Sequence, residues 1–568
     1  MDVKQNRKLP VLIVTGLIAV VIIIGIISEL INLRTPTKEM ADPYEVYVVE
    51  EGAVALISNG VLSETQGLWL NDMAYVSLGI VCNELNDHFY WDSTEELLIC
   101  TTATEIVDAD ASSVCNGSPV FFVLDTDDED AEDEDIVYVS LDYVAQYTNI
   151  QVDTFTDPNR VFIRSSWGES EQLTVGEDGA ALRVEAKIKS PILVNLTAGS
   201  TLWVISTEDS WAKVYDSASG YSGYVKLSDS DTVQTVEEDG PYDAPEYTSI
   251  TSDEPVCLVW HQVFTTSGVD SIESLLASTS GVTVVSPTWF SIVSSDGTIE
   301  SRANQTYVDT VHAQGMQVWA LVENFNTSNT IDNAMLLNTT TSRRALIEAL
   351  VSEALAYDID GINVDLESLP SSAGEGYLQF IRELSVYCRQ YGLVLSVDNY
   401  VPSAWTTHYS REEQSEVIDY LIIMAYDEHY SGSEEAGSTS SLTFVSEGLE
   451  DTVEEGVPEE KIINAIPFYS RVWSGEGNSL TSEIISMPDM DTFLAEDGVE
   501  VTWLSDLGQY YAWSGSGSSL TQIWIEDAES IETKLEVMSE YDLAGVACWK
   551  LGMETEDVWD VIAAYLAQ

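Results

Sequence analysis

A short run of acidic and amide side chains carries the clearest chemical signal in this sequence. Residues 358–367 read Asp-Ile-Asp-Gly-Ile-Asn-Val-Asp-Leu-Glu, so that Asn363, Asp365 and Glu367 alternate with apolar residues. This period of two is typical of a β-strand with one apolar face and one face that carries an amide and two carboxyl groups. Neighbouring carboxyl groups suit general acid catalysis, because a nearby negative charge raises the pKa of a carboxyl and keeps it protonated near neutral pH.

The elements around this strand decide whether its polar groups are buried. From residue 256 the sequence alternates between apolar strands and amphipathic helices, which predicts an α/β fold, the (β/α)8 TIM barrel. Strands of such a barrel are covered on both faces, so each polar group costs about 1–3 kcal/mol unless it has a partner or a function. A solvent-exposed antiparallel strand is the alternative. The predicted strands are 256–260, 282–286, 316–322, 359–367, 393–400, 420–427, 461–466 and 544–549, with helices such as 343–356 and 376–391 between them.

The acidic strand and three later segments resemble glycoside hydrolase family 18. The family signature is Asp-Gly-x-Asp-x-Asp-x-Glu at the end of the fourth barrel strand. This chain matches it at four positions (Asp360, Gly361, Asp365 and Glu367) and departs from it at Asn363. Three later segments resemble further strands of the family. Met-Ala-Tyr-Asp at 424–427 resembles its sixth strand, and Ile-Pro-Phe-Tyr-Ser-Arg at 466–471 resembles its seventh. Gly-Val-Ala-Cys-Trp-Lys-Leu-Gly at 545–552 resembles its eighth.

The resemblance implies a role for each matching side chain. Glu367 would be the general acid, and Asp365 would orient the substrate's 2-acetamido group, whose own oxygen attacks the anomeric carbon in this family. Tyr426 would hydrogen-bond the same group. Asn363 would hold Asp365 in place. The resemblance further implies five substrate-binding residues: Asp427, Trp549 as the floor under the sugar, Met424, Tyr469 and Arg471.

Some of these assignments have simpler alternatives. Trp549 could be ordinary barrel packing, and Arg471 could pair with one of the many acidic residues. The amide of Asn363 cannot ionise, so it would shift the pH profile without removing the acid at Glu367. Trp289, in Ser-Pro-Thr-Trp-Phe at 286–290, is taken as a further substrate-binding residue.

Two departures from common chitinases indicate a subgroup. Val-Trp-Ala-Leu-Val-Glu-Asn-Phe at 318–325 stands where many chitinases have Ser-x-Gly-Gly. Together with residues 286–290 and the amide at Asn363, this resembles the spore-cortex and germination glycosidases, which act on peptidoglycan. We therefore expect a retaining, substrate-assisted glycosidase that cleaves β-1,4 bonds after N-acetylglucosamine in cell-wall peptidoglycan. The alternatives are a chitinase or chitooligosaccharide hydrolase, and a catalytically silent glycan-binding wall protein.

The net charge limits the partners of the chain. It has 96 acidic and 22 basic residues, a net charge of −74. Nucleic acid is excluded as a partner, because binding it requires clustered Lys and Arg. So acidic a surface should also repel anionic wall polymers at low salt. The densest acidic run, residues 125–135, is expected to be a solvated loop, with loose cation binding as the alternative.

The sequence gives no sign of a metal, a cofactor or a thiol site. The histidines are scattered without metal-ligand spacing, and no nucleophile elbow supports a serine-histidine hydrolase. The six cysteines contain no Cys-x-x-Cys pair. A bridge between Cys82 and Cys100 is left open for an oxidising location. We expect no metal, no cofactor and a monomer.

The N-terminal part predicts an anchor and two small modules. Residues 9–27 are almost wholly apolar and follow Lys4, Arg7 and Lys8, which favours a membrane-spanning anchor with extracellular domains. A cleaved signal peptide, and hence a secreted or wall-bound protein, is the alternative. Tyr-Val-Ser-Leu occurs at 75–78 and again at 138–141.

Each copy of this repeat reads as a strand, a helix and two strands. It resembles the small domain at the N-terminus of copper amine oxidases, without implying copper chemistry. The short aromatic strands that follow resemble a bacterial Src-homology-3-like barrel. The expected domains are 1–40 (tail and anchor), 41–168 (amine-oxidase-N-like), 169–230 (Src-homology-3-like), 231–254 (linker) and 255–568 (catalytic barrel).

Overall fold

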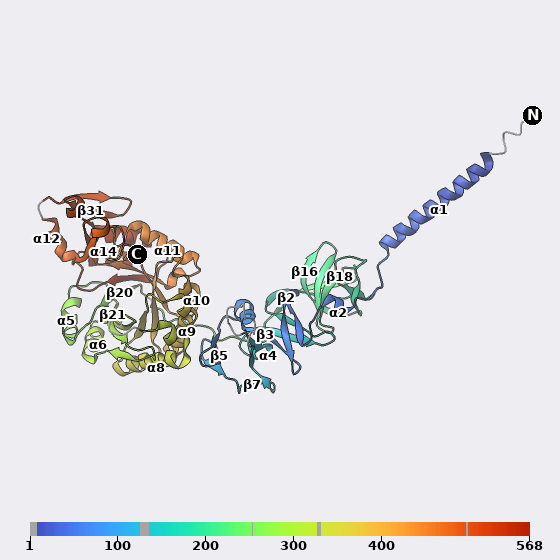
Figure 1. Cartoon of the computed structure of the whole chain (residues 1–568), viewed down its shortest axis with the longest axis horizontal. Helices are drawn as coiled ribbons and strands as arrows, with labels where there is room; N and C mark the ends of the chain where they lie inside the picture. The colour runs from blue at the N-terminus through green and yellow to red at the C-terminus, as the bar shows by residue number, and fades with distance from the viewer. Residues whose placement is uncertain (1–7, 125–135, 253, 326–330, 496–497, 568) are drawn as a thin grey trace, which may run out of the picture. The chain divides into compact units, whose positions relative to one another are not determined.

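The chain groups into two compact units. The computed structural model describes residues 8–124, 136–252, 254–325, 331–495 and 498–567 (Figure 1). One unit consists of Met1–Phe89 and Ala109–Ala244, and the other of Tyr90–Asp108 and Pro245–Gln568. The acidic run 125–135, predicted to be a solvated loop, lies outside the described residues.

The second unit contains the predicted closed barrel of eight parallel strands. The strand order is β20-β33-β27-β26-β25-β24-β23-β21, and pairing of β20 with β21 closes the ring. The sequence-based prediction of a TIM-like barrel is therefore confirmed. Its strands are β20 (Val256–His261), β21 (Val284–Ile292), β23 (Gln317–Glu323), β24 (Gly361–Asp365), β25 (Val394–Tyr400), β26 (Tyr420–Met424), β27 (Ile462–Pro467) and β33 (Gly545–Trp549).

The alternation along β24 sorts its residues between two cores. Ile362 and Val364 are fully buried in the core between the barrel and its helices. Asn363 lies on the opposite face and contacts residues that fill the barrel interior, among them Trp260. Gly361 permits close strand packing, because a Cβ atom there would lie 2.8 Å from both the Trp319 ring and the Val394 carbonyl oxygen. The period-two pattern thus places the amide and the carboxyl groups inside the barrel.

Helices surround the barrel and fix the strand ends. Helix α8 is capped at its C-terminus by Asp358, which takes a left-handed conformation, and α9 by Gly392 with φ +70°, as is common at helix C-termini. A short turn then leads from α8 into β24 and from α9 into β25. The helices are α5 (Thr266–Leu276), α6 (Gln305–His312), α7 (Asn333–Asn338), α8 (Thr340–Tyr357), α9 (Gly374–Tyr391), α10 (Arg411–Val417), α11 (Leu442–Glu454), α13 (Ala528–Met538) and α14 (Val558–Leu566).

Two additions extend the barrel. A short strand β22 (Ile299–Ser301) pairs antiparallel with the end of β21 and forms a hairpin. Between β27 and β33 the chain builds a separate five-stranded sheet and the short helix α12 (Met490–Leu494). The strands of this sheet are β28 (Tyr469–Ser474), β29 (Thr481–Ser486), β30 (Glu500–Leu504), β31 (Gln509–Ser514) and β32 (Thr521–Ile525).

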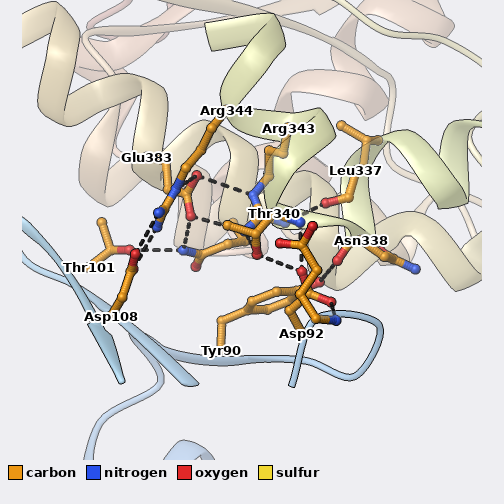
Figure 2. Close-up of polar contacts among 12 residues, drawn as sticks. Tyr90, Asp92, Thr101, Asp108, Leu337, Asn338, Thr340, Arg343, Arg344 and Glu383 are labelled. Carbon is orange, nitrogen blue, oxygen red and sulfur yellow. Dashed lines mark hydrogen bonds and ion pairs between the residues drawn. The ribbon is translucent and has the colours of Figure 1, made fainter. Parts of the chain in front are cut away.

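Residues 90–108 pack on the outer helices of the barrel, although they lie far away in the sequence (Figure 2). They belong to a small sheet of β4 (Phe89–Asp92), β5 (Leu97–Thr101) and β6 (Ile106–Ala109). The buried Asp92 accepts hydrogen bonds of 2.6 Å from both the backbone N–H and the hydroxyl of Thr340. It thereby caps the N-terminus of α8, where the residue before the helix provides no side-chain cap.

Charged side chains strengthen this contact. Arg344 donates to both carboxylate oxygens of Asp108 at 2.6 and 2.7 Å, the bidentate geometry of a strong pair. Beside it, Arg343 and Glu383 form a fully buried ion pair at 3.0 Å (Figure 2). The guanidinium of Arg343 also lies 5.0 Å from the ring of Tyr90. The predicted domain 41–168 is therefore divided, since 90–108 groups with the barrel.

Among its described residues, the first unit contains two seven-stranded sheets and a short two-stranded one of β7 (Val114–Cys115) and β8 (Ser118–Pro119). The two copies of the Tyr-Val-Ser-Leu repeat lie on β3 and β10, which pair antiparallel with Ser140 opposite Tyr75. The first sheet has β1 (Ala53–Ser58), β2 (Val61–Leu70), β3 (Met73–Ser77), β9 (Phe121–Leu124), β10 (Ile136–Ser140), β11 (Gln151–Phe155) and β12 (Arg160–Arg164). The second has β13 (Gly168–Thr174), β14 (Ala180–Arg183), β15 (Ile192–Leu196), β16 (Thr201–Glu208), β17 (Trp211–Asp216), β18 (Tyr221–Lys226) and β19 (Thr232–Glu238).

Part of the predicted linker 231–254 forms a strand. Residues 232–238 form β19 and pair along their whole length with β13. Their Thr, Gln and Glu content looks like a linker, yet four of the seven residues are β-branched (Thr232, Val233, Thr235 and Val236) and favour a strand once a partner strand is present. The resemblances of the two modules to known domains stay predictions.

Two further sequence-based expectations can be placed in the structure. The six cysteines are free thiols, so Cys82 and Cys100 are not bridged. Helix α1 (Lys8–Arg34) covers the predicted anchor. Within it, an 18-residue stretch of Leu12–Arg34 has a mean hydropathy of 2.7, and the segment is long and apolar enough to cross a bilayer.

Candidate active site

The site is built on a buried amide at the centre of the barrel. Asn363 accepts hydrogen bonds from the Trp260 indole N–H at 2.9 Å and from the Ser286 hydroxyl at 3.0 Å. Its own N–H donates to Asp398 at 2.7 Å. All four side chains are buried. Because both ends of the amide are held by these groups, Asn363 fixes Asp398, and not Asp365 as predicted, and it does not itself line the cavity.

Asp398 is a functional candidate that the sequence analysis missed. It lies on β25 and is buried. Burial raises the pKa of Asp398 well above its usual range, while the hydrogen bond from Asn363 opposes this rise. The sequence does indicate this candidate, because Ser396 and Asp398 alternate with the apolar Leu395 and Val397, as the polar residues do on β24.

Asp365 ends β24 and faces the cavity. Burial raises the pKa of Asp365 well above its usual range, and the nearby carboxyl groups, Glu367 foremost, raise it further. One of its carboxyl oxygens, Oδ1, is buried and has no hydrogen-bond partner among the described residues. A buried oxygen without a partner costs stability. It is therefore suited to receive a hydrogen bond from a ligand.

Glu367 lies two residues beyond the strand and is held from both sides. Its backbone N–H donates to the Asn324 side-chain oxygen at 3.0 Å, and the Asn324 amide donates back to the Glu367 carbonyl at 2.8 Å. The Tyr400 hydroxyl donates to the carboxylate at 2.6 Å. Burial raises the pKa of Glu367, the Tyr400 hydrogen bond lowers it, and the charge of Asp427 raises it again. The net direction is upward, which favours a protonated acid.

The carboxyl groups of Asp365 and Glu367, but not that of Asp398, open into one cavity of about 610 Å³. This volume lies within the usual range of about 300–1,000 Å³ for small-molecule sites. The cavity lies at the carboxyl ends of the barrel strands, where catalytic residues of this fold are found. Its lining residues are Gln262, Val263, Phe264, Thr288, Ser291, Glu300, Arg302, Leu321, Glu323, Phe325, Asp365, Glu367, Tyr426, Asp427 and Trp549.

Four of the predicted substrate-contacting and catalytic side chains thus share the cavity with Glu367: Asp365, Tyr426, Asp427 and Trp549. Trp549 is half-buried at the end of β33 and lies 5.8 Å from the Trp260 ring. The arrangement offers an apolar wall beside paired carboxyl groups and a phenol.

Tyr469 and Arg471 support the cavity from behind Asp427. The Tyr469 hydroxyl donates to Asp427 at 2.6 Å, and the Arg471 guanidinium lies 3.4 Å from the same oxygen. Both side chains are buried and neither lines the cavity. Their place in the structure fits orientation of Asp427 better than contact with a ligand.

Two further predicted substrate-binding residues, in addition to Tyr469 and Arg471, do not line the cavity. Trp289 is fully buried and packs edge-on against Tyr307 in the core outside the barrel. Its neighbour Thr288 lines the cavity instead, since successive residues of a strand face opposite sides. Met424 is buried on β26 and is also absent from the lining. Trp289 therefore faces away from the cavity, contrary to its predicted role as a substrate contact, whereas the predicted role of Met424 stays a prediction.

The charged groups of the site do not form a metal centre. Among the described residues, no three His, Cys, Asp or Glu side chains are grouped to hold a metal ion. The chemistry that the geometry offers is proton donation from a raised-pKa acid beside a second, buried carboxyl group.

Comparison with known families decides the class of the barrel. The model of the glycosyl hydrolases family 18 matches residues 262–554, more than half of the chain. The chain belongs to glycosyl hydrolase family 18. It is therefore a glycosidase, and the family resemblance expected from its motifs is confirmed.

Relatives of this family 18 chain include both cortical fragment-lytic enzymes and chitinases. It is 23% identical over 259 residues to the uncharacterized glycosylase YvbX of Bacillus subtilis, which covers 44% of this chain and 74% of that protein. It is 25% identical over 235 residues to the cortical fragment-lytic enzyme of Bacillus subtilis, which covers 40% of this chain and only 54% of that enzyme.

A solved structure agrees with the fold of the barrel unit. The chitinase of Chromobacterium violaceum is 22% identical, with a TM-score of 0.50 over 55% of this chain and 99% of that one. A class V chitinase of Arabidopsis thaliana is 23% identical over 310 residues, which covers 46% of this chain and 80% of that protein.

Proposed function

We propose that this glycosidase cleaves β-1,4 bonds after N-acetylglucosamine in peptidoglycan, with retention and with help from the substrate. The observation that carries the mechanism is the pairing of Glu367, an acid of raised pKa, with the partnerless buried oxygen of Asp365 in one cavity. An acetamido N–H is a donor of the kind that this oxygen lacks.

The proposed reaction has two steps. In the first, Glu367 gives its proton to the glycosidic oxygen as the bond to the anomeric carbon breaks. The substrate's acetamido oxygen attacks that carbon from the other face, and Asp365 accepts a hydrogen bond from the acetamido N–H. In the second, the Glu367 carboxylate takes a proton from water, which attacks the anomeric carbon and restores the acetamido group. Tyr426 and Trp549 would hold the sugar during both steps.

Peptidoglycan is favoured over chitin as the substrate by the relatives and by the motifs. Cortical fragment-lytic enzymes of three Bacillus species are among the similar proteins. The sequence at 318–325 also departs from the pattern of many chitinases. Chitin remains the second candidate because class V chitinases match over a similar length.

The test compares the wild-type chain with Glu367→Gln on purified peptidoglycan and on chitin oligomers, with mass analysis of the products. Muropeptides that end in reducing N-acetylglucosamine, formed by the wild type alone, would support the proposal. Cleavage of chitin oligomers alone would move the enzyme to the chitinases. Equal products from both proteins would contradict the assigned acid.

We also propose that α1 anchors the enzyme in the cell membrane with both units outside. No part of the apolar segment is buried within the rest of the protein. Lys and Arg before it favour a cytoplasmic N-terminus. Protease treatment of intact cells tests this: digestion of the units with survival of a short membrane fragment supports the anchor, whereas recovery of the chain in the medium supports secretion.

A further inference from the structure

The cavity contains a single basic residue among many acidic ones. Of the fifteen lining residues, five are carboxylic acids (Glu300, Glu323, Asp365, Glu367 and Asp427), and Arg302 is the one Lys or Arg among the described residues that line it. The composition of the chain, with 96 acidic and 22 basic residues, makes a cavity rich in acids unsurprising. The contacts of Arg302 therefore decide whether it has a role there.

The β21–β22 hairpin places Arg302 at the cavity. Its backbone N–H donates to the Trp289 carbonyl at 3.0 Å, which fixes the residue directly after β22. The guanidinium donates one hydrogen bond, of 2.9 Å, to the Ser291 hydroxyl. The side chain is 28% exposed. A guanidinium has five N–H donors in a planar fork, so most of its donors are available to a ligand.

Its neighbouring acid does not account for Arg302. The Glu300 carboxylate lies 3.6 Å from the guanidinium, beyond hydrogen-bond distance, and is 64% exposed. Exposed pairs of this kind contribute little to stability. An arginine with spare donors beside a glycan site is instead suited to a planar carboxylate, which it binds through two parallel hydrogen bonds.

We propose that Arg302 binds the lactyl carboxylate of an N-acetylmuramic acid residue next to the cleaved N-acetylglucosamine. This inference rests on the proposed function, and it names the feature by which the enzyme would distinguish wall glycan from chitin. Chitin has no carboxylate. In the muramic sugar the lactyl group carries one wherever no peptide is attached. Without Arg302, those acids of the cavity that are ionised would repel such a substrate.

The experiment uses the full chain and three tetrasaccharides. The first alternates N-acetylglucosamine and N-acetylmuramic acid with free lactyl carboxylates, the second is its neutral N-methylamide, and the third is chitotetraose. The variants are Arg302→Gln, Arg302→Lys and Glu300→Gln. Lys187→Gln is the control for charge, because it removes one positive charge from an exposed side chain that is outside the cavity.

The readout is the ratio of kcat/KM for the free acid to kcat/KM for the methylamide. Arg302→Gln should lower this ratio about 10- to 100-fold, the loss expected for a charge-assisted pair. Arg302→Lys should give an intermediate ratio, because lysine keeps the charge and loses the planar fork. Glu300→Gln should raise the ratio, since it removes a competing negative charge. Lys187→Gln should leave it unchanged.

The outcomes separate this inference from the proposed function. If Arg302→Gln lowers the rates on all three substrates equally, Arg302 only shapes the site, and the inference is wrong. Cleavage of chitotetraose alone by the wild type also refutes it while leaving the enzyme a glycosidase. If Glu367→Gln cleaves every substrate as fast as the wild type, the proposed mechanism fails independently of Arg302.

Discussion

Replacement of Asp92 should destabilise the catalytic barrel, although Asp92 lies 273 residues before Asp365 in the chain. Its carboxylate is fully buried and accepts four hydrogen bonds, two of them from Thr340 at the start of α8. The other two come from the backbone N–H groups of Thr94 and Glu95 in its own turn. Asp92→Ala removes the acceptor for both donors of Thr340.

The magnitude follows from those two buried bonds. A hydrogen bond to a charged group contributes about 1.5–3 kcal/mol, and loss of a helix cap costs typically about 1 kcal/mol. Thr340 is itself buried, so water cannot readily replace the carboxylate, whereas the turn at Thr94 can rehydrate. We expect a loss of about 3–5 kcal/mol in the free energy of unfolding. At about 2 °C per kcal/mol for a large domain, the midpoint should fall by about 6–10 °C.

Thermal inactivation of glycosidase activity is the assay, because it reports on the barrel unit and not on the rest of the chain. Glu105→Ala is the matched control, since Glu105 is an exposed acid of the same segment. Asp92→Asn should fall between the control and Asp92→Ala, because an amide keeps one acceptor oxygen. A midpoint for Asp92→Ala within about 1 °C of the control would refute the claim that residues 90–108 stabilise the barrel.

Three other predictions concern the acids of the site. Glu367→Gln should lower kcat by about 10²–10⁴-fold, measured on the cleaved glycan, because it removes general acid catalysis. Tyr400→Phe removes the hydrogen bond that lowers the pKa of Glu367, so the acid stays protonated to higher pH. The basic limb of kcat/KM against pH should move upward, and a downward shift would contradict this role. Asn363→Asp places a second carboxyl group within hydrogen-bond distance of Asp398, and the pair must share one proton. The folded-state pKa is then raised above the unfolded value of about 3.9, so the variant should lose stability as pH rises above about 4. Melting temperatures from pH 4 to 8 should show a deficit that grows with pH, and a constant deficit would exclude a shared proton.

The sequence was sufficient for the barrel and for the acids on β24, because both depend on local periodicity. The alternation that placed Asn363 and Asp365 inside the barrel holds, and each of the eight predicted strands overlaps an observed one. The same rule corrects the assignment of Trp289, whose neighbour Thr288 faces the cavity. Asp398 could have been found by the same alternation on β25.

Other features depend on contacts between distant segments and leave no local pattern. Nothing in residues 90–108 indicates that Asp92 caps a helix 248 residues further on. Likewise, Arg302 directly follows β22, and the pairing of β22 with β21 brings Arg302 to the cavity. Such residues become visible only when the strands and helices are assembled.

Because residues 90–108 pack on the barrel, they help to hold the barrel to the part of the chain that carries α1. The polypeptide crosses between the two units at residues 89–90, 108–109 and 244–245. A single protease cut near residue 244 would break one of these connections. The barrel would still be bound through the hydrogen bonds of Asp92 and Asp108, because these residues remain covalently joined to the N-terminal fragment. With α1 as the proposed anchor, shedding of the glycosidase would require both a cut and the dissociation of this segment. The glycosidase would thus act on glycan close to the surface of the cell that made it.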